Sequence, residues 1–441
     1  MLLSGFGWST PQSQGKRGAK PPAMNRHPSS QHQDSADKNA RGSDFSKVEP
    51  WYWFPSPATN WSGPDFIGRP GGSKDELPWK IKASVLHSVR AHQGVLRSIA
   101  VCQDECYLFT AGVAPGFKGT VQKWELSRID SISGYYGHEE VVNDISLLAS
   151  SGRVASCDGT VHVWNGQTGK LISLFAEFST SSVHHTSSLP KASKLNVEQA
   201  NMLHFSPLSG GILNTDANLY TSMYYSEYLD NIVVGTGNGS LRFIDVRQGQ
   251  KLHLWRSEAT ESNFPSLISS ICSSASTKQQ YGNARYPSWV AVGQSSGHCR
   301  LFDMRSGKII SSWQAHDGFV TKIATPEEHL LVSSSLDRTI RIWDLRRNWK
   351  PKALASRGHT DGVSDFAIWG QNVISISRSK IGLSSLASSS DVDGHQFVTP
   401  QYLYMGDRES KNVSVLSSIN VLPFSRLFVV GTEDGHLKIC C

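Results

Sequence analysis

The stretch VASCDGTVHVWNGQTGK, residues 154–170, places several chemically active residue types within a few positions of one another. Asp158, Cys157 and His162 could supply a carboxylate, a thiol and an imidazole, which are the groups of an activated nucleophile and its base. A carboxylate, an imidazole and a hydroxyl together could also form a catalytic triad. An active site occurs once in a chain, so the interpretation depends on whether the pattern repeats.

Two glycine-rich motifs also match known catalytic or binding patterns. GQSSG, at 293–297, fits G-x-S-x-G, which requires a sharp turn from a strand into a helix. GTGNGS, at 235–240, would need a following helix N-terminus to bind phosphate. Both motifs lie in polar turns between strand-like runs with no helical pattern after them. We therefore predict no catalytic residues and no enzymatic activity.

Seven cysteines are scattered along the chain, and none is predicted to bind a metal ion. Cys102 and Cys106 have no second pair and no histidines at the spacing of a zinc site. We therefore expect the cysteines to be reduced thiols, and we expect the protein to bind no metal ion and no cofactor.

Charge and hydropathy limit the classes of partner. Residues 1–50 hold seven Lys and Arg and four Asp and Glu, which is about half of the formal net charge of +6. The rest of the chain is near neutral, which argues against a nucleic-acid partner. MLLSGFGW at the start is too short an apolar run for a signal peptide, and no 18-residue apolar run follows. We expect a cytoplasmic protein whose membrane association is only indirect.

Short alternating runs separated by turn residues begin at about residue 79 and predict an all-β fold. One six-residue pattern recurs in them, and neighbouring copies of its Trp position lie 40 or 41 residues apart where no insertion intervenes. The copies are GTVQKW (119–124), GTVHVW (159–164), GSLRFI (239–244), GHCRLF (297–302), RTIRIW (338–343), the degenerate KIGLSS (380–385) and GHLKIC (435–440). The stretch at 154–170 is therefore one copy of a repeat.

Histidines precede the pattern at a fixed distance. His138, His316 and His359 stand 25 to 27 residues before the Trp position of their own copies. A histidine at this distance from a tryptophan, repeated every 40 residues, is typical of the WD40 repeat, in which each repeat is one four-stranded blade. Seven copies predict an all-β, seven-bladed WD40 β-propeller.

The repeat also explains the polar residues of the opening stretch. We predict structural tetrads in which the carboxylate orients the histidine and the serine links it to the indole N–H, so that each buried polar group has a partner. Because two such sets occur at the same spacing, they indicate a scaffold and not an active site. The sets are His138, Ser156, Asp158 and Trp164 in the second copy and His316, Ser335, Asp337 and Trp343 in the fifth.

Domain boundaries follow from composition and from a count of strands. Residues 1–46 are predicted to be a disordered basic low-complexity tail, and 47–78 an extended arm rich in aromatic residues and proline. The propeller is expected to span 79–441. Its last copy has a third strand but no fourth, so we expect the strand 81–92 to complete the last blade and close the ring.

WDLR, at 343–346, suggests a second function. Its residues Asp344 and Arg346 match the Trp-Asp-x-Arg motif of propellers that act as substrate receptors of cullin-based ubiquitin ligases. Weaker echoes stand at 302–305 and 244–247. The simpler interpretation is a charge pair on an exposed turn, which contributes little energy. A possible adaptor contact through Asp344 and Arg346 therefore remains the alternative.

Beyond the generic repeat, the chain resembles the C-terminal propeller of plant BEACH-domain WD-repeat proteins that also carry a kinase-like region. The resemblance covers roughly 49–441. It rests on WYWFPSPATNWSGPDFIGR (51–69), DECYLFTAGVAPGFKGTVQKWELSRI (104–129), ASCDGTVHVW (155–164), GSLRFIDVR (239–247), LVSSSLDRTIRIW (331–343), KIGLSSL (380–386) and VVGTEDGHLKI (429–439).

The resemblance implies a non-catalytic protein–protein interaction scaffold in endosomal and vacuolar membrane traffic, located at the periphery of endosomes. Its partners are expected to be other proteins. The chain contains neither a BEACH domain nor a kinase-like domain. We therefore expect a fragment, a truncated gene model or a short isoform.

Overall fold

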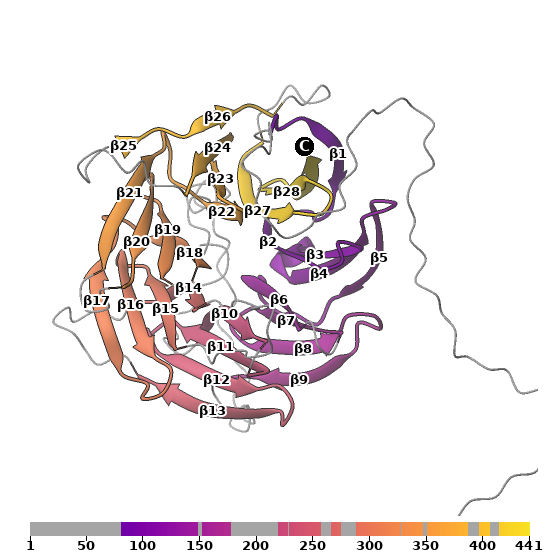
Figure 1. The fold of residues 1–441 in the computed structure, drawn as a ribbon. Helices are drawn as coiled ribbons and strands as arrows, with labels where there is room; N and C mark the ends of the chain where they lie inside the picture. Colours follow the sequence, from indigo (N-terminus) through magenta and orange to yellow (C-terminus); the bar gives the residue numbers. More distant parts are fainter. Residues whose placement is uncertain are drawn as a thin grey trace, which may run out of the picture. The chain divides into compact units, whose positions relative to one another are not determined.

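A computed structural model of the 441-residue chain describes residues 81–148, 152–177, 219–227, 229–256, 266–274, 288–327, 329–346, 351–386, 397–405 and 414–441. These residues form seven sheets arranged in a ring (Figure 1), which confirms the predicted seven-bladed propeller. One 3-10 turn, η1 (Pro115–Phe117), is the single helical element among them. The predicted tail at 1–46 and arm at 47–78 lie outside the described residues.

Each blade takes its strands from the inside of the ring outward. Blade 1 consists of β2 (Leu96–Val101), β3 (Tyr107–Val113), β4 (Gly119–Glu125) and β5 (Asp130–Tyr135). Blade 2 consists of β6 (Asp144–Leu148), β7 (Arg153–Cys157), β8 (Val161–Asn165) and β9 (Leu171–Phe175). Blade 3 consists of β10 (Tyr220–Ser226), β11 (Asn231–Thr236), β12 (Leu241–Asp245) and β13 (Gln250–Trp255). Blade 4 consists of β14 (Ile268–Ser273), β15 (Trp289–Gln294), β16 (His298–Asp303) and β17 (Ile309–Gln314).

The remaining blades contain two departures from this order. Blade 5 consists of β18 (Val320–Glu327), β19 (Leu330–Ser335), β20 (Thr339–Asp344) and β21 (Lys352–Gly358), and β25 (Phe397–Val398) adds a short parallel fifth strand. Blade 6 consists of β22 (Asp365–Trp369), β23 (Asn372–Ser377), β24 (Lys380–Ser385) and β26 (Gln401–Leu403). Blade 7 consists of β27 (Leu416–Leu422), β28 (Leu427–Thr432), β29 (His436–Cys440) and, from the other end of the propeller, β1 (Val85–Arg90).

The position of a strand in its blade explains its sequence. Second strands such as β15 (WVAVGQ) are buried along their whole length because a neighbouring blade covers each face. Such strands carry continuous apolar runs instead of a simple alternation. Outer strands such as β9 (LISLF) are largely exposed. All seven six-residue patterns of the sequence lie on or next to third strands, and in six of them the terminal Trp or its replacement is buried between blades.

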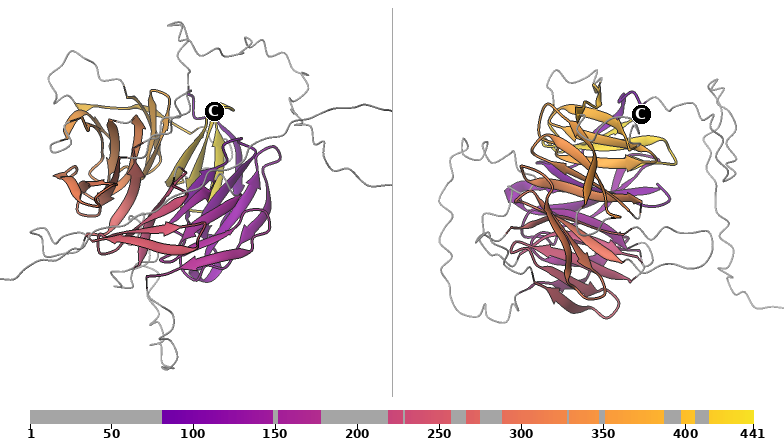
Figure 2. Two further views of the ribbon diagram at one scale, coloured as in Figure 1. Left: turned by 60° about the horizontal axis from the view of Figure 1, so that its bottom comes forward. Right: turned by 60° about the vertical axis from the view of Figure 1, so that its left-hand side comes forward.

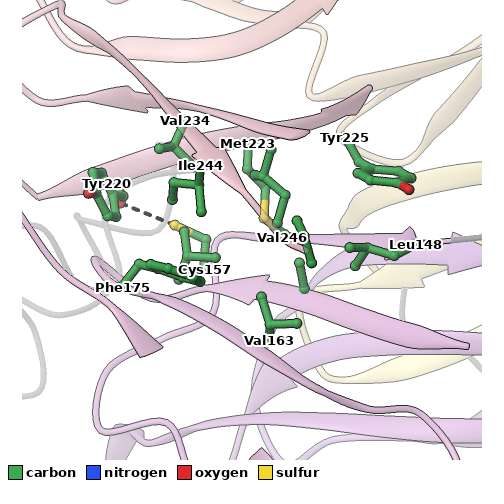
Figure 3. Close-up of a cluster of buried hydrophobic side chains, with 13 residues drawn as sticks. Leu148, Cys157, Val163, Phe175, Tyr220, Met223, Tyr225, Val234, Ile244 and Val246 are labelled. Carbon is green, nitrogen blue, oxygen red and sulfur yellow. Dashed lines mark hydrogen bonds between the residues drawn. The ribbon is translucent and has the colours of Figure 1, made fainter. Parts of the chain in front are cut away.

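The hydrophobic core is divided among the contacts between neighbouring blades. Seven clusters of buried side chains fill the seven contacts, and Figure 2 shows from two further directions how adjacent sheets pack face against face. The cluster between blades 2 and 3 contains Phe175, Met223 and Ile244 (Figure 3). Because no blade has a core of its own, each blade is stabilised by its two neighbours.

Strand β1 closes the ring. It runs antiparallel to β29, with Val85 opposite Cys440 and Arg90 opposite His436, so that the indigo β1 lies beside the yellow strands of blade 7 in Figure 1. The backbone N–H groups of Ala91 and His92 both donate to the Gly435 carbonyl, at 2.8 and 3.0 Å. This is the pairing that the strand count leads us to expect.

Two partly buried aspartates on inner strands also hold the ring together. Asp144 of blade 2 accepts hydrogen bonds from the Ser98 hydroxyl of blade 1, at 3.5 Å, and from the Met223 backbone N–H of blade 3, at 3.2 Å. Asp365 of blade 6 pairs with the Lys322 ammonium of blade 5, at 2.7 Å, and accepts a backbone N–H of blade 7. Each carboxylate therefore links three successive blades.

Candidate functional site

The β7–β8 hairpin of blade 2 positions the polar set around Trp164. His138 Nε2 lies 2.6 Å from Ser156 Oγ, and the Trp164 indole N–H donates to the same oxygen at 3.0 Å. His138 Nδ1 lies 2.9 Å from an Asp158 carboxylate oxygen. The structure therefore brings His138, Ser156, Asp158 and Trp164 together in one buried network.

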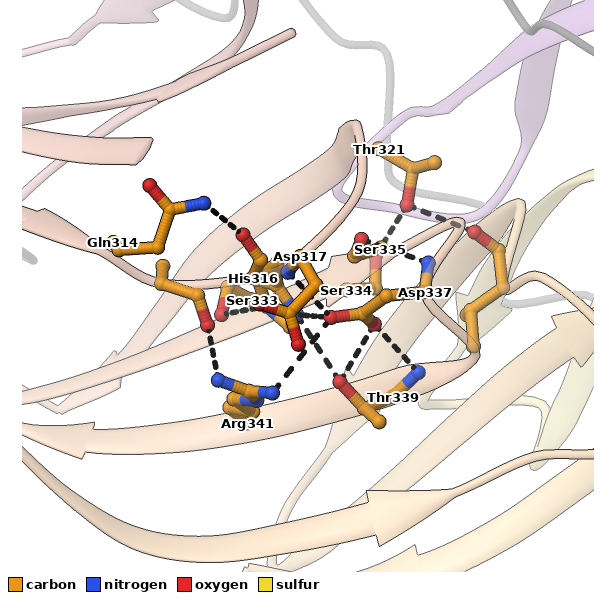
Figure 4. A network of polar contacts seen from close by, with 12 residues as sticks. Gln314, His316, Asp317, Thr321, Ser333, Ser334, Ser335, Asp337, Thr339 and Arg341 are labelled. Atoms are coloured by element: carbon orange, nitrogen blue, oxygen red, sulfur yellow. Dashed lines mark hydrogen bonds and ion pairs between the residues drawn. The ribbon is translucent and has the colours of Figure 1, made fainter. Parts of the chain in front are cut away.

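Blade 5 repeats this network with one correction to the prediction (Figure 4). His316 Nδ1 lies 2.9 Å from the Asp337 carboxylate, while His316 Nε2 lies 2.7 Å from Ser333 Oγ. The Trp343 indole N–H donates to Ser333 Oγ at 2.9 Å. The tetrad serine is therefore Ser333, and the assignment of Ser335 is wrong.

Turn length is the reason for this error. The prediction placed the serine two residues before the aspartate, which is the spacing of Ser156 and Asp158 in blade 2. Ser333 pairs with Arg341 across the blade 5 hairpin, as Ser156 pairs with His162 across the blade 2 hairpin. More residues separate the paired positions in blade 5, so its turn is two residues longer. Ser335 is the last residue of β19, at the start of that turn, where its Oγ accepts the Asp337 backbone N–H at 3.0 Å.

Two further blades carry reduced versions that the sequence analysis did not assign. In blade 1, His92 lies 2.9 Å from the Thr110 hydroxyl, which accepts the Trp124 indole N–H at 3.0 Å. In blade 6, His359 lies 3.0 Å from the Ser375 hydroxyl. Hydroxyl groups of Thr120 and Ser377 face the second nitrogens of these histidines, where blades 2 and 5 have aspartate. The regular histidine spacing was the signal that could have identified the blade 6 set, whereas His92 stands 32 residues before Trp124, outside that spacing.

Blade 2 contains a second buried histidine beside its tetrad. His162 lies with its ring centroid 4.1 Å from that of His138. His162 Nδ1 is 2.7 Å from the Tyr135 hydroxyl, and Nε2 is 2.9 Å from the Thr160 hydroxyl and 3.5 Å from Asp158. The ligand atoms of His138, Asp158 and His162 lie within 4.8 Å of one another, so this is the group in the described residues that could hold a metal ion. Each ring nitrogen of the two histidines lies within 2.9 Å of a protein oxygen atom.

Electrostatics favour a structural role for these groups. Burial acts to raise the pKa of the Asp158 carboxyl group, whereas hydrogen bonds from His138 and Thr160 stabilise the carboxylate and act to lower it. The hydrogen bonds outweigh burial, and the pKa of Asp158 falls to about 2. Complete burial raises the pKa of the Cys157 thiol far above its usual range. A neutral thiol is a poor nucleophile and a poor metal ligand. Cys157 instead donates a weak hydrogen bond to the Tyr220 carbonyl, at 3.4 Å (Figure 3).

The WDLR residues form a local charge pair. Arg346 donates from Nε and Nη2 to the Asp344 carboxylate at 2.9 and 2.6 Å, although its side chain is 69% exposed. Asp344 also accepts the Arg346 backbone N–H at 2.9 Å. In the two echoes of the motif, Asp245 and Asp303 likewise accept a backbone N–H two residues later. The aspartate thus shapes the turn after the third strand in all three blades.

The repeat network and the ring of seven sheets agree with comparisons to known protein families. Residues 130–165 match the WD domain, G-beta repeat, and residues 173–388 match the N-terminal domain of nucleolar protein 10-like proteins. The chain is a WD-repeat β-propeller. In the described part of this propeller, no helix has the length and apolar character that a membrane-spanning segment requires.

Relatives of the propeller confirm the resemblance to the plant BEACH-type WD-repeat proteins. It is 56% identical to Protein GFS12 of Arabidopsis thaliana over 444 aligned residues, which cover 100% of this chain and 26% of that protein. It is 24% identical to the probable inactive serine/threonine-protein kinase lvsG of Dictyostelium discoideum, covering 82% of this chain and 15% of lvsG. Human WD repeat-containing protein 81 is 25% identical over 84% of this chain and 16% of its own length. The chain therefore spans only about a quarter or less of the length of these relatives.

We expect the folded chain to lose stability in acid, because some of its buried histidines have no aspartate partner. Burial lowers the pKa of His359 from 6.5 to about 4. The unfolded chain therefore binds a proton near pH 6.5 that the folded chain takes up only near pH 4, so stability present above pH 6.5 is lost as the pH falls toward 4. Between pH 7 and pH 5 this difference amounts to about 1–2 kcal/mol for one histidine.

Urea unfolding of the His359→Gln variant at pH 7 and pH 5 checks this prediction. The fall in unfolding free energy between the two pH values is expected to be smaller than in the unaltered chain by that amount. His87→Gln is the matched control, because His87 is exposed on β1. Equal pH dependence in the His359 variant and the unaltered chain would contradict the assignment.

Proposed function

We propose that this propeller is a non-catalytic protein–protein interaction scaffold that acts in endosomal and vacuolar membrane traffic as part of a BEACH-type protein. The observation that carries the proposal is the 56% identity to Protein GFS12 across the whole chain. Because the alignment covers 100% of this chain, it includes the exposed turns and outer strands as well as the core. The surface that binds partners is therefore expected to be shared, and not only the fold.

The state of the polar groups supports a scaffold over an enzyme. The histidines, aspartates and serines that first suggested catalysis hydrogen-bond to one another in the interior of the blades. The thiols of Cys157, Cys272 and Cys299 are buried, and burial raises the pKa of each above its usual range. A catalytic group must instead reach substrate with a pKa suited to its task.

The expected partners are proteins, and the expected location is the cytoplasmic side of endosomal membranes. Membrane association would be indirect, through bound partners or through domains that lie outside this chain. This location is part of the proposal, as is the absence of a nucleic-acid partner.

Affinity purification of the tagged full chain from plant cell extract, with mass spectrometry of the bound proteins, tests the proposal. We expect proteins of endosomal and vacuolar traffic to be enriched over a control propeller that lacks BEACH-type relatives. Fluorescence microscopy of the tagged chain should place it beside endosomal markers. Enrichment of nuclear or nucleolar proteins without endosomal proteins would overturn the proposal.

The alternative, a substrate receptor of a cullin-based ubiquitin ligase, is favoured by one observation, the high exposure of the Arg346 side chain. Arg247, which is 79% exposed in the echo of the motif on blade 3, offers a matched control. If the alternative holds, the purified proteins include a cullin adaptor, and Arg346→Ala abolishes its capture while Arg247→Ala does not. We expect no adaptor with either variant, because the Arg346 guanidinium is held by Asp344.

A further inference from the structure

Exposed apolar side chains gather on the outer strands of two neighbouring blades. Among the described residues, nine large hydrophobic side chains are exposed, and five of them lie on or directly after β5 and β9. We call these five side chains the apolar rim: Ile132, Tyr136, Leu171, Ile172 and Leu174, which are 45–67% exposed. A concentration of this kind indicates an interaction surface, because single scattered hydrophobic residues would need no explanation.

The two strands of the apolar rim form one continuous surface. Gly169, in the turn that leads into β9, has a φ of +66° and lies against β5. A Cβ atom at Gly169 would stand 2.9 Å from the Gly134 carbonyl oxygen, so glycine permits the close approach of this turn. Since Gly134 lies between Ile132 and Tyr136, the start of β9 is adjacent to the exposed side chains of β5.

Strand β9 is an edge strand whose outer side has no partner in the described part of the chain. Blade 2 has the order β6-β7-β8-β9, and β9 pairs with β8. An edge strand presents a row of backbone N–H and C=O groups that can pair with another strand. The five residues of β9, LISLF, carry no charge that would oppose such pairing.

Three other outer strands of the propeller are protected. The outer strand of blade 3 exposes Lys251 and His253, and that of blade 7 exposes His87 and Arg90. In blade 5, the chain itself covers the edge, because β25 pairs in parallel with β21. Charged side chains and added strands are the usual means by which proteins prevent edge pairing. The outer strands β17 (IISSWQ) of blade 4 and β26 (QYL) of blade 6 also carry no charge, but neither exposes a large hydrophobic side chain. The absence of such protection from β9, together with its exposed apolar side chains, is consistent with an edge that is kept available.

Charges at the two ends of β9 define the chemistry of a partner. Lys170 is exposed immediately before the strand, and Lys251 lies at its other end, where its ammonium donates to the Ala176 carbonyl at 2.8 Å. The nearby carboxylate of Glu177 is already paired with Arg242. An uncharged apolar strand between two lysines is complementary to an apolar segment with acidic residues at both ends.

We propose that β9 accepts an extended segment of a partner protein as an added strand, and that this segment has an apolar centre flanked by acidic residues. Main-chain hydrogen bonds would provide affinity, while the apolar rim and the two lysines would provide specificity. This inference deepens the proposed scaffold function by assigning it a surface. A second copy of the chain is disfavoured as the occupant. Antiparallel pairing of two β9 strands would place each Lys170 close to Lys251 of the other copy, and like charges repel.

Peptide selection on the purified full chain tests the proposal. The probe is a displayed library of nine-residue peptides with a randomised centre and ends. We expect enriched peptides to carry Val, Ile or Leu in the centre and Asp or Glu at both ends. Binding of a selected peptide should slow hydrogen–deuterium exchange of the backbone amides of 171–175, which side-chain docking elsewhere would not do.

Three variants test whether peptide binding depends on β9 itself and not on any change of charge at the surface. Leu174→Lys and Lys170→Glu should each weaken binding of the selected peptide by about tenfold or more, because they add a charge to the edge or reverse one at its end. Leu86→Lys is the matched control, because Leu86 is 49% exposed on the outer strand of blade 7. It should leave the affinity unchanged. Circular dichroism should confirm that all three variants are folded.

The outcomes distinguish a failure of this inference from a failure of the proposed function. If endosomal proteins are captured equally by the unaltered chain and by Leu174→Lys, the scaffold function holds and the β9 surface is wrong. If the selected peptides carry no acidic ends, or bind all variants equally, the proposed partner chemistry is wrong. If the chain dimerises through β9 in sedimentation analysis, the occupant is a second copy and the proposal is overturned. If selected peptides bind at β9 but no endosomal protein is captured, the surface holds and the proposed function fails.

Discussion

Removal of residues 1–90, and with them strand β1, is expected to open the propeller. β1 pairs with β29 at five positions, and Ile81, just before it, is buried between blades 6 and 7. At about 1 kcal/mol net for each backbone hydrogen bond, the strand contributes on the order of 5 kcal/mol, before the burial of Ile81 is included. The edge of β29 would also become available for pairing with other chains, so we expect aggregation as well as lower stability.

Thermal and urea unfolding of fragments 91–441 and 79–441 measure this effect. Fragment 91–441 keeps His92 and therefore the polar set of blade 1, so its defect would report on the loss of residues 79–90 and not on that set. We expect a cooperative transition for 79–441 and an early, broad or absent transition for 91–441. A peptide of residues 79–90 should partly restore the transition when added in excess. Closure by β1 would be refuted if the two fragments unfolded at the same midpoint without the peptide.

Features that repeat along the chain could be predicted from the sequence, whereas features found once could not. The third strands were located correctly because each ends a fixed distance after its turn, and the closing strand followed from counting them. The pairing of β25 with blade 5 had no such signal, because its segment belongs to an insertion that no other blade shares. The contacts of Asp144 and Asp365 depend on the register between inner strands of different blades, which a single sequence does not reveal.

The candidate site shows the same limit at the level of single residues. Three consecutive serines, 333 to 335, were possible partners of Trp343, and only the length of the turn decides among them. The apolar rim was also missing from the sequence analysis, because Leu171 and Phe175 are both apolar residues of β9. Only the packing of the blades shows that Leu171 is exposed while Phe175 is buried.

Replacement of Trp164 by alanine should destabilise the chain by about 3–5 kcal/mol. The indole is 1% exposed and lies between blades 1 and 2, where it stacks on Tyr135 with ring centroids 5.1 Å apart and meets the edge of Phe109 at 5.9 Å. Alanine would leave a cavity at this contact, and Ser156 would lose the indole donor of the tetrad. Both effects act on a contact between blades, so the loss should appear in the unfolding of the whole ring.

Urea midpoints at pH 7 for Trp164→Ala and Phe424→Ala provide the measurement. Phe424→Ala removes an aromatic side chain that is 80% exposed, so it should change the unfolding free energy by no more than about 0.5 kcal/mol. Asp158→Ala should lie between the two, at about 1–3 kcal/mol, because it leaves the buried His138 Nδ1 without its carboxylate partner. If the Trp164 variant unfolds at the midpoint of the unaltered chain, the tetrad does not stabilise the propeller. If the three variants follow the expected order, the residues that first suggested catalysis act through the stability of the blades.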